Sequence, residues 1–204
     1  MLRRLILSGG IAVFITGCTA DQPEPTALEV RVPIYAQGGN GDFNLGTHLI
    51  GDEEVLATSP HPSVSPAQGQ AIFRINAEGT SANFRLIASN IDNVTQAHIH
   101  CGLPGTNGPI AMWLYPEAEI GPPPGTAAPN GSGPQDGVLA SGTFSLVGVD
   151  CPVSAFGAGV HLIDAIRDGR TYVNVHTNDG VTPTNTGPGD FPGGEIRGQL
   201  DDGN

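Results

Sequence analysis

The sequence predicts an all-β fold, a Greek-key-like β-sandwich or barrel with long Pro/Gly-rich loops and one short helix. Short runs of alternating apolar and polar residues recur along the chain, separated by Gly, Pro, Asn and Ser, which is typical of strands joined by turns. The 204 residues include 30 Gly and 18 Pro, and helical spacing of apolar residues occurs in only one short segment. At this length we expect one domain with a sizeable core.

Eight segments alternate in this way and are predicted as strands. In the second of them Ala71, Phe73 and Ile75 share one face, and in the third Phe84 and Leu86 do, which predicts a common core. In chain order the segments are Leu28–Tyr35, Gly69–Asn76, Ser81–Ala88, Gln96–His100, Ile110–Tyr115, Val138–Leu146, Thr171–Thr177 and Glu195–Leu200.

The remaining body of the chain is one short helix and two long loops. Apolar spacing over Val160–Gly169 predicts two helical turns that end at Gly169 in a left-handed conformation. The loops Glu119–Gly137 and Asn178–Gly193 are too rich in Pro and Gly to form strands or helices. Loops of this length are mobile or functional, so we expect the second, which lies between His176 and Arg197, to act as a lid.

The first 17 residues have the layout of a secretory signal peptide. Arg3 and Arg4 precede the apolar run Leu5–Ile15, which is too short to span a bilayer. The segment ends in Ile-Thr-Gly followed by Cys18, which resembles a bacterial lipobox, and we therefore expect Cys18 to be lipidated as the first mature residue. An ordinary signal peptide cleaved nearby is the alternative.

These motifs divide the chain into a signal peptide over residues 1–17, a lipidated Cys18 with a polar tether over residues 18–27, and a single β domain over residues 28–204. The lipid would attach the protein to the bacterial cell envelope, on its periplasmic or extracellular face. Membrane contact through this anchor is therefore the first expected partnership.

The charge of the chain argues against nucleic acid as a partner. The formal net charge is −12, and removal of the signal peptide with its two arginines makes it −14. All eight basic residues are arginine, so no basic patch of lysines is available for phosphates and none for Schiff-base chemistry. The remaining partners that we expect are an envelope protein or a polysaccharide.

Two cysteines, Cys101 and Cys151, remain once Cys18 is assigned to the lipid. In an oxidising compartment an isolated pair predicts a disulfide. The alternative is that Cys101, directly after His100, is a thiolate ligand in a His-x-His-Cys cluster that suits Cu(I).

The last strands carry the candidate site. If Ile99, Val173, Val175, Ile196 and Leu200 point into the core, alternation places the polar residues of the same strands on the opposite face, where we expect them on an outer surface. These polar residues are His98, His100, His176, Glu195 and Arg197.

Three histidines on one face are candidate copper ligands, because imidazole nitrogens suit copper. Glu195 and Asn174 are expected to support the ligands by hydrogen bonds, and Arg197 would guide an anion if the protein is an enzyme. The alternative is a hydrogen-bonded scaffold without metal, with Glu195 and Arg197 as a surface ion pair. His48, His61 and His161 are predicted to be ordinary packing or surface residues.

Several ordered motifs resemble the CHRD domain, which is found in chordin and in many microbial secreted proteins. They are Leu49–Val55, Gly69–Ala71, Ala97–His100 with Gly105–Pro109, Tyr172–Thr177 and Gly193–Leu200, and together they cover about residues 48–200. The chain departs from the family after Val55, in the enlarged loop before Gly193, and in having Cys101. The resemblance implies an all-β fold but no defined activity.

The order of the site residues also resembles copper/zinc superoxide dismutases, in which a His-x-His pair, a later Val-His strand and a C-terminal arginine surround copper. The positions here are His98, His100, His176 and Arg197. No counterpart of the histidine that bridges the two metals is present, and no zinc cluster follows His100, so a two-metal enzyme is not expected.

The sequence as a whole predicts an envelope-tethered CHRD lipoprotein that acts as a binding module with a histidine site for copper. The rival predictions are a copper-only, superoxide dismutase-like oxidoreductase and a purely structural or adhesive domain. Metal-dependent activity would favour the enzyme.

Overall fold

The structure is a computed structural model, and it describes residues 36–37, 42–116 and 133–200. The predicted strand Leu28–Tyr35, the signal peptide, the Cys18 tether and most of the first long loop lie outside these residues. No helix in the described ranges is long and apolar enough to cross a membrane.

Nearly all of the described regular structure is β. The strands are β1 (Ala36–Gln37), β2 (Phe43–Ile50), β3 (Gln68–Ile75), β4 (Ser81–Asp92), β5 (Val94–Cys101), β6 (Ile110–Tyr115), β7 (Pro134–Ser145), β8 (Thr171–Thr177) and β9 (Ile196–Leu200). Two short α-helices, α1 (Val153–Phe156) and α2 (Leu162–Arg167), join β7 to β8, and two 3₁₀ turns, η1 (Gly51–Glu53) and η2 (Pro62–Val64), join β2 to β3. The prediction of an all-β fold is confirmed.

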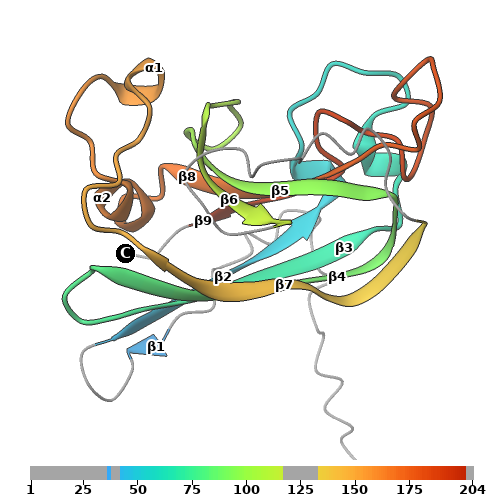
Figure 1. Cartoon of the computed structure of the whole chain (residues 1–204). Coiled ribbons are helices and arrows are strands. Elements are labelled where there is room, and N and C mark those ends of the chain that lie inside the picture. Colours follow the sequence, from blue (N-terminus) through green and yellow to red (C-terminus); the bar gives the residue numbers. More distant parts are fainter. Residues whose placement is uncertain (1–35, 38–41, 117–132, 201–204) are drawn as a thin grey trace, which may run out of the picture. The chain divides into compact units, whose positions relative to one another are not determined.

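The strands form one antiparallel, nearly closed, barrel-like sheet in the order β6-β5-β8-β9-β2-β3-β4-β7, with β1 paired to β2. Figure 1 shows β5, β6 and β8 above β2, β3, β4 and β7, so the sheet folds over on itself. The crossovers are Greek-key-like, because β9, the last strand in sequence, lies between β8 and β2.

The core lies between the two halves of the sheet and follows the alternation of the strands. Phe73, Phe84 and Phe144 from β3, β4 and β7 form an aromatic cluster with ring centroids 5.9 to 6.4 Å apart. Ile99 and Val173 from β5 and β8 are fully buried in the same core. Burial of this apolar surface is the main stabilising contribution to the fold.

Two elements were not predicted, and strand β7 begins at Pro134, within the segment up to Gly137 that was expected to be a loop. Strand β2 was not predicted, because Gly46, Thr47 and His48 interrupt its alternation, although it pairs with β3 along its whole length. The sequence predicted one helix, and α1 is an additional one. It is a single turn between Pro152 and Gly157, which is too short to show a helical periodicity. The predicted helix is α2, and Gly169 has the expected left-handed conformation, with φ of 63°.

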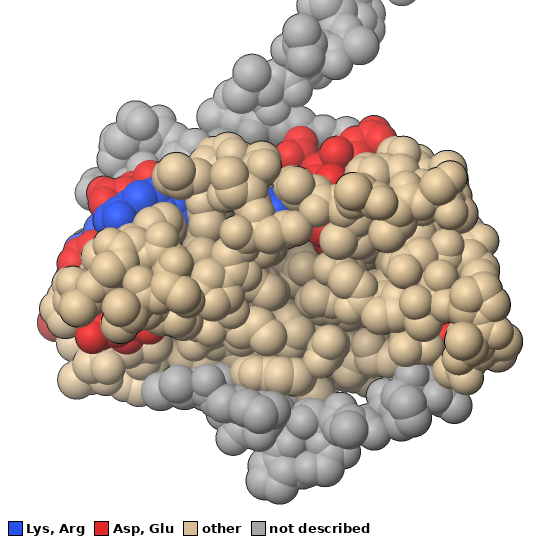
Figure 2. Space-filling view, turned by 90° about the horizontal axis from the view of Figure 1, so that it is seen from above, with Lys and Arg blue, Asp and Glu red and all other residues tan. Residues whose placement is uncertain are grey.

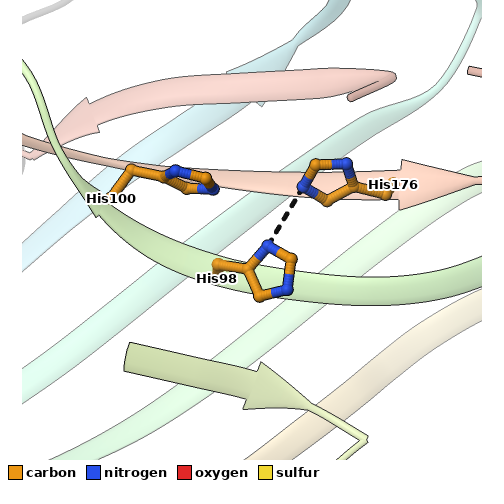
Figure 3. Close-up of side chains that lie close together, drawn as sticks. All are labelled: His98, His100 and His176. Atoms are coloured by element: carbon orange, nitrogen blue, oxygen red, sulfur yellow. Dashed lines mark hydrogen bonds between the residues drawn. The ribbon is translucent and has the colours of Figure 1, made fainter. Parts of the chain in front are cut away.

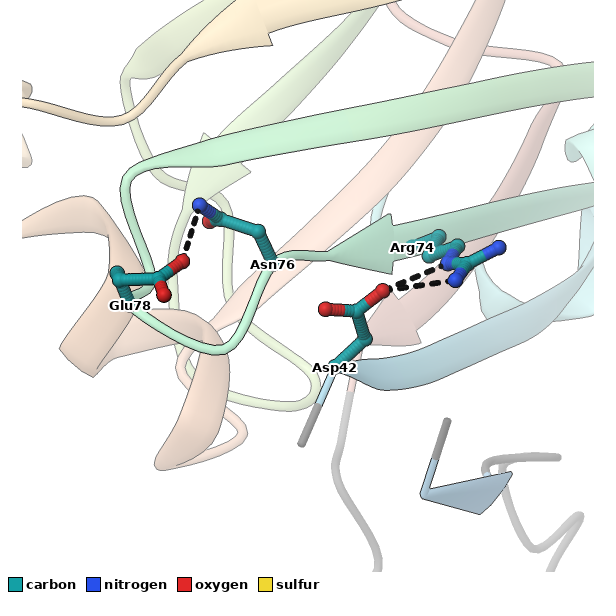
Figure 4. Close-up of polar contacts among 4 residues, drawn as sticks. All are labelled: Asp42, Arg74, Asn76 and Glu78. Carbon is teal, nitrogen blue, oxygen red and sulfur yellow. Dashed lines mark hydrogen bonds and ion pairs between the residues drawn. The ribbon is translucent and has the colours of Figure 1, made fainter. Parts of the chain in front are cut away.

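Single residues with side-chain hydrogen bonds hold the tight turns. Asn93 alone separates β4 from β5, with φ of 55°, and its side chain bonds Gly133 and Gly189. At the end of β3, Asn76 accepts hydrogen bonds from two backbone N–H groups and donates to Glu78, beside the exposed ion pair of Arg74 with Asp42 (Figure 4). Such Asx interactions stabilise turns.

Cys101 and Cys151 form a disulfide, with their Cα atoms 5.8 Å apart. Both residues are buried in the core, where Cys101 ends β5 and Cys151 precedes α1. The alternative in which Cys101 is a thiolate ligand does not fit, because a disulfide sulfur is no longer a thiolate.

Candidate metal centre

The register of the sheet places the predicted site residues on one face. His98 of β5 pairs with Asn174 of β8, and Asn174 pairs with Arg197 of β9, so these three side chains lie in one row across the strands. His100 and His176 stand two residues away from this row on the same face. The predicted grouping is confirmed.

This face is not an outer surface, and that part of the prediction is wrong. The side chains of His98, His100, His176, Glu195 and Arg197 are all buried, with exposed fractions between 0% and 8%. Three connections cover them and contact them through hydrogen bonds: residues 51–67, 102–109 and 178–194. In Figure 1 loops lie above β5 on this side of the sheet.

The covering loops are packed into the site by specific contacts. Asn107 of the second loop donates to the Val55 carbonyl of the first. Phe191 and Asp190 of the third loop are buried, and Phe191 N–H donates to Thr177 at the end of β8. The loop Asn178–Gly193, expected at the edge of the site as a lid, is therefore part of its wall.

The three histidines come together. One ring nitrogen from each of His98, His100 and His176 lies within 4.8 Å of the others, and they are the one group of three or more possible metal ligands found among the described residues. His98 Nδ1 lies 3.1 Å from His176 Nε2 (Figure 3). Metal–nitrogen bonds of about 2.0–2.1 Å bring ligand nitrogens to roughly 3.4 Å from one another, so a pair 4.8 Å apart must approach by roughly 1.4 Å.

Backbone carbonyls fix the tautomers of two histidines. His100 Nδ1 donates to the Gly108 carbonyl at 2.8 Å, and His176 Nδ1 donates to the Pro192 carbonyl at 2.8 Å. A carbonyl only accepts, so each proton stays on Nδ1 and each Nε2 keeps its lone pair. Carbonyl partners of this kind orient histidine ligands in metal sites.

Burial keeps all three rings neutral. It lowers the pKa of His98 to about 2, helped by repulsion from His176 and His100. Burial also lowers the pKa of His100 and of His176 to about 4. Neutral imidazole is the form that binds metal, so protons do not compete for these ligands near neutral pH.

Aromatic rings surround the ligands. Trp113 of β6 meets His98 edge-on, with ring centroids 4.2 Å apart, and Tyr172 of β8 stacks on His100 at 4.7 Å. Sequence reasoning missed both residues as parts of the site. In the structure Tyr172 lies opposite His100 on the neighbouring strand.

Arg197 is held in place by its neighbours and does not face solvent. Its guanidinium donates to Asn107 Oδ1 at 3.2 Å and to the Thr106 carbonyl at 2.9 Å. Its Cζ atom lies 3.5 Å from the ring centroid of Tyr172, a cation–π contact. The arginine expected on an outer surface therefore links β9 to the loop 102–109.

Glu195 is a buried carboxylate that joins the covering loops to β8. It accepts hydrogen bonds from Ser65 Oγ, from Thr177 Oγ1 at 2.6 Å and from Gly189 N–H at 2.9 Å. These bonds join two covering loops to the end of β8, and no ion pair links Glu195 to Arg197 within the described part of the chain. The expected surface ion pair is wrong.

Glu54 lies near Arg197 in the site, and sequence reasoning did not identify it. It is buried, Oε1 has no hydrogen-bond partner, and burial raises its pKa to about 8. Attraction to Arg197 and hydrogen bonding with Asn174 oppose that rise. Glu54 lies inside the Leu49–Val55 motif, which is the only signal that pointed to it.

Gly194 and Gly198 are needed at their positions because a side chain at either would collide with its neighbours. A Cβ atom at Gly194, where φ is 130°, would collide with the Glu54 carboxylate. A Cβ atom at Gly198 would collide with the His48 carbonyl of the neighbouring strand β2. Glycine at these two positions lets the Glu54 carboxylate and the His48 carbonyl pack closely against the backbone.

The three other histidines lie outside the site, as predicted. The exposed side chain of His161 pairs with Asp150 at 2.7 Å, and His61 accepts from Ser63 N–H at the start of η2. His48 lies on β2 with an intermediate exposure. None of them is in the group of possible ligands found in the described ranges.

Comparison with known proteins identifies the family. A model of the CHRD domain matches residues 45–200, which include every candidate ligand. No curated protein and no solved structure matches the chain, so the likeness of the histidine order to copper/zinc superoxide dismutases stays a prediction. The matched range agrees with the resemblance of residues 48–200 and spans most of the sequence. The chain belongs to the CHRD domain family.

Proposed function

We propose that this CHRD domain is a metal-binding module that holds one copper ion on His98, His100 and His176 at the cell envelope. The observation that carries the proposal is the convergence of three buried, neutral imidazoles within 4.8 Å. Backbone carbonyls hold the protons of His100 and His176 on Nδ1, so Nε2 of each carries a lone pair.

A hydrogen-bonded scaffold explains these contacts less well. His98 Nε2 and His100 Nε2 are buried and have no hydrogen-bond partner. Buried polar atoms are nearly always paired, and an unpaired one costs about 1–3 kcal/mol. A metal would use the unpaired lone pair of His100, whereas a scaffold leaves it unsatisfied.

The ligand chemistry favours copper. Three imidazoles suit Cu(I) and Cu(II), and aromatic rings around the ligands exclude water from a soft ion. Copper bound there would supply a redox-active centre. Binding is favoured over turnover, because the donors of Arg197, the proposed anion guide, are engaged by Asn107 and Thr106.

The envelope location rests on the sequence. Cys18 in its lipobox-like context would carry the lipid anchor, and the Cys101–Cys151 disulfide suits an oxidising compartment. An envelope protein or a polysaccharide remains the proposed macromolecular partner. Nucleic acid is not a proposed partner, because the formal net charge of the chain is −12. Figure 2 shows one face of the molecule, which is mostly uncharged and has acidic residues and one basic cluster toward its edge.

Copper stoichiometry tests the proposal. The protein, exported with its own signal to an oxidising compartment, would be loaded with copper, desalted and assayed by elemental analysis. We expect about one copper per chain, and none in a His98/His100/His176 triple-alanine variant. The matched control replaces His48, His61 and His161 and keeps its copper.

Equal copper in the wild type and the site variant would overturn the proposal, as would no copper in the wild type. A superoxide-dismutation assay on the loaded protein then separates binding from catalysis. Turnover that depends on His98 would establish the enzyme, and copper held without turnover would establish the binding module.

A further inference from the structure

We propose that Asn174 supplies a fourth, oxygen donor to the metal, and that Glu54 orients it. The inference rests on the proposed function, because it concerns the same ion. Asn174 is 3% exposed and lies in register with His98 on β5, and on its own strand it stands two residues before His176. It therefore has ligands on two sides.

The contact with His176 is the first step of the argument. Asn174 Oδ1 lies 3.0 Å from His176 Nε2. The Pro192 carbonyl holds the proton of His176 on Nδ1, so Nε2 presents a lone pair to the amide oxygen. Two acceptors that face one another at this distance are stabilised by a cation that both can bind.

The other end of the amide decides its orientation. If the Asn174 amide were turned by 180°, its NH₂ group would donate to His176 Nε2, and two acceptors would no longer face each other. Asn174 also interacts with Glu54, whose Oε1 has no hydrogen-bond partner. The positive charge of a bound ion and of Arg197 favours the ionised form of Glu54, which only accepts, so in the loaded site the NH₂ group faces Glu54 and Oδ1 faces the histidines. Gly194 leaves room for that carboxylate, because any larger residue would collide with it.

The resulting donor set is three imidazole nitrogens and one amide oxygen. Four donors suit a divalent ion, and oxygen favours Cu(II) over Cu(I). Three imidazoles alone are sufficient for Cu(I). Asn174 would therefore let the site hold both oxidation states and keep water away from the ion.

The test compares Asn174→Leu, which removes the oxygen at similar size, with Asn174→Asp, which retains one. Full-length protein would be loaded with Cu(II) and examined by pulsed EPR in D₂O for deuterons of coordinated water. We expect none in the wild type or in Asn174→Asp, and a clear signal in Asn174→Leu. Cu(II) affinity should fall about tenfold or more in Asn174→Leu, while Cu(I) affinity stays within about twofold.

Two further variants complete the experiment. Glu54→Gln should also weaken Cu(II) binding, because its amide can hold Asn174 in the turned orientation. Asn83→Ala, at an exposed position of β4, should change nothing. Coordinated water in the wild type, or equal Cu(II) affinity in the wild type and Asn174→Leu, would overturn this inference alone. Failure of the wild type to take copper would overturn the proposed function as well.

Discussion

Strands β5, β8 and β9 bury both of their faces, by different means. The apolar face, with Ile99, Val173 and Ile196, packs against the other half of the sheet. The polar face, with His98, Asn174 and Arg197, is covered by loops that bond to it through carbonyls and side chains. Alternation in the sequence identifies which residues share a face, but it does not tell whether the polar face meets water.

The largest effect of a single substitution should come from the covalent link on the apolar face. Cys151→Ser opens the disulfide to Cys101, which closes a loop with a sequence separation of 50. We expect a loss of about 4 kcal/mol from the free energy of unfolding, measured by urea denaturation. A Cys101→Ser variant with the same loss would assign it to the bond, and an unchanged urea midpoint would contradict the prediction.

Neighbouring residues on β5 test the two faces directly. Ile99→Ala should cost about 3 kcal/mol through the cavity it leaves, while the metal site stays intact. His98→Ala should abolish copper binding with a smaller loss of stability, because its Nε2 atom is unpaired in the fold. Denaturation and copper analysis on both variants would check this. If His98→Ala lost more stability than Ile99→Ala, the main role of the polar face would be to stabilise the fold.

The polar face should also make stability depend on pH. In the unfolded chain the three histidines have a pKa near 6.5, whereas in the folded protein it is about 4 or lower. As pH falls from 6.5 toward 4, only the unfolded chain takes up these protons, so stability is lost by up to about 1.4 kcal/mol per pH unit for each histidine.

Glu54 acts in the opposite direction, because its folded pKa of about 8 lies above its usual value of 4.5. The folded protein keeps this proton as pH rises through that range, so the stability it gives is lost by about pH 8. Metal-free protein should thus be most stable near neutral pH by urea denaturation. Glu54→Gln should remove the alkaline decline and leave the acid decline.

The smallest effect is expected outside both faces. Arg74→Ala breaks the ion pair with Asp42, in which the arginine side chain is 57% exposed (Figure 4). Exposed pairs contribute about 0–1 kcal/mol. A loss above that range in thermal denaturation would show that surface charge matters more here than the buried faces suggest.

The sequence predicted the strands with regular alternation and their shared face. β6 and β8 have the bounds that alternation predicts, and His98, His100 and His176 converge as expected. Those signals are local, since one strand with period two determines the face of each side chain.

What the sequence could not show depends on contacts between distant segments. Glu54 and Asn107 reach the site from loops that have no periodic pattern, and the burial of Arg197 depends on both loops being in place. Phe191 stands in a loop rich in Gly and Pro, so its burial beside Thr177 follows from tertiary packing alone.

The position of β9 has a consequence for when the centre can form. Although it is the last strand in sequence, it lies between β8 and β2, and it brings Arg197 into the row that contains His98 and Asn174. A chain still emerging from a ribosome or a translocation pore therefore lacks the strand that joins the two halves of the sheet. If the proposed function holds, ion uptake has to follow the closure of the sheet, and only completely folded molecules carry the ion.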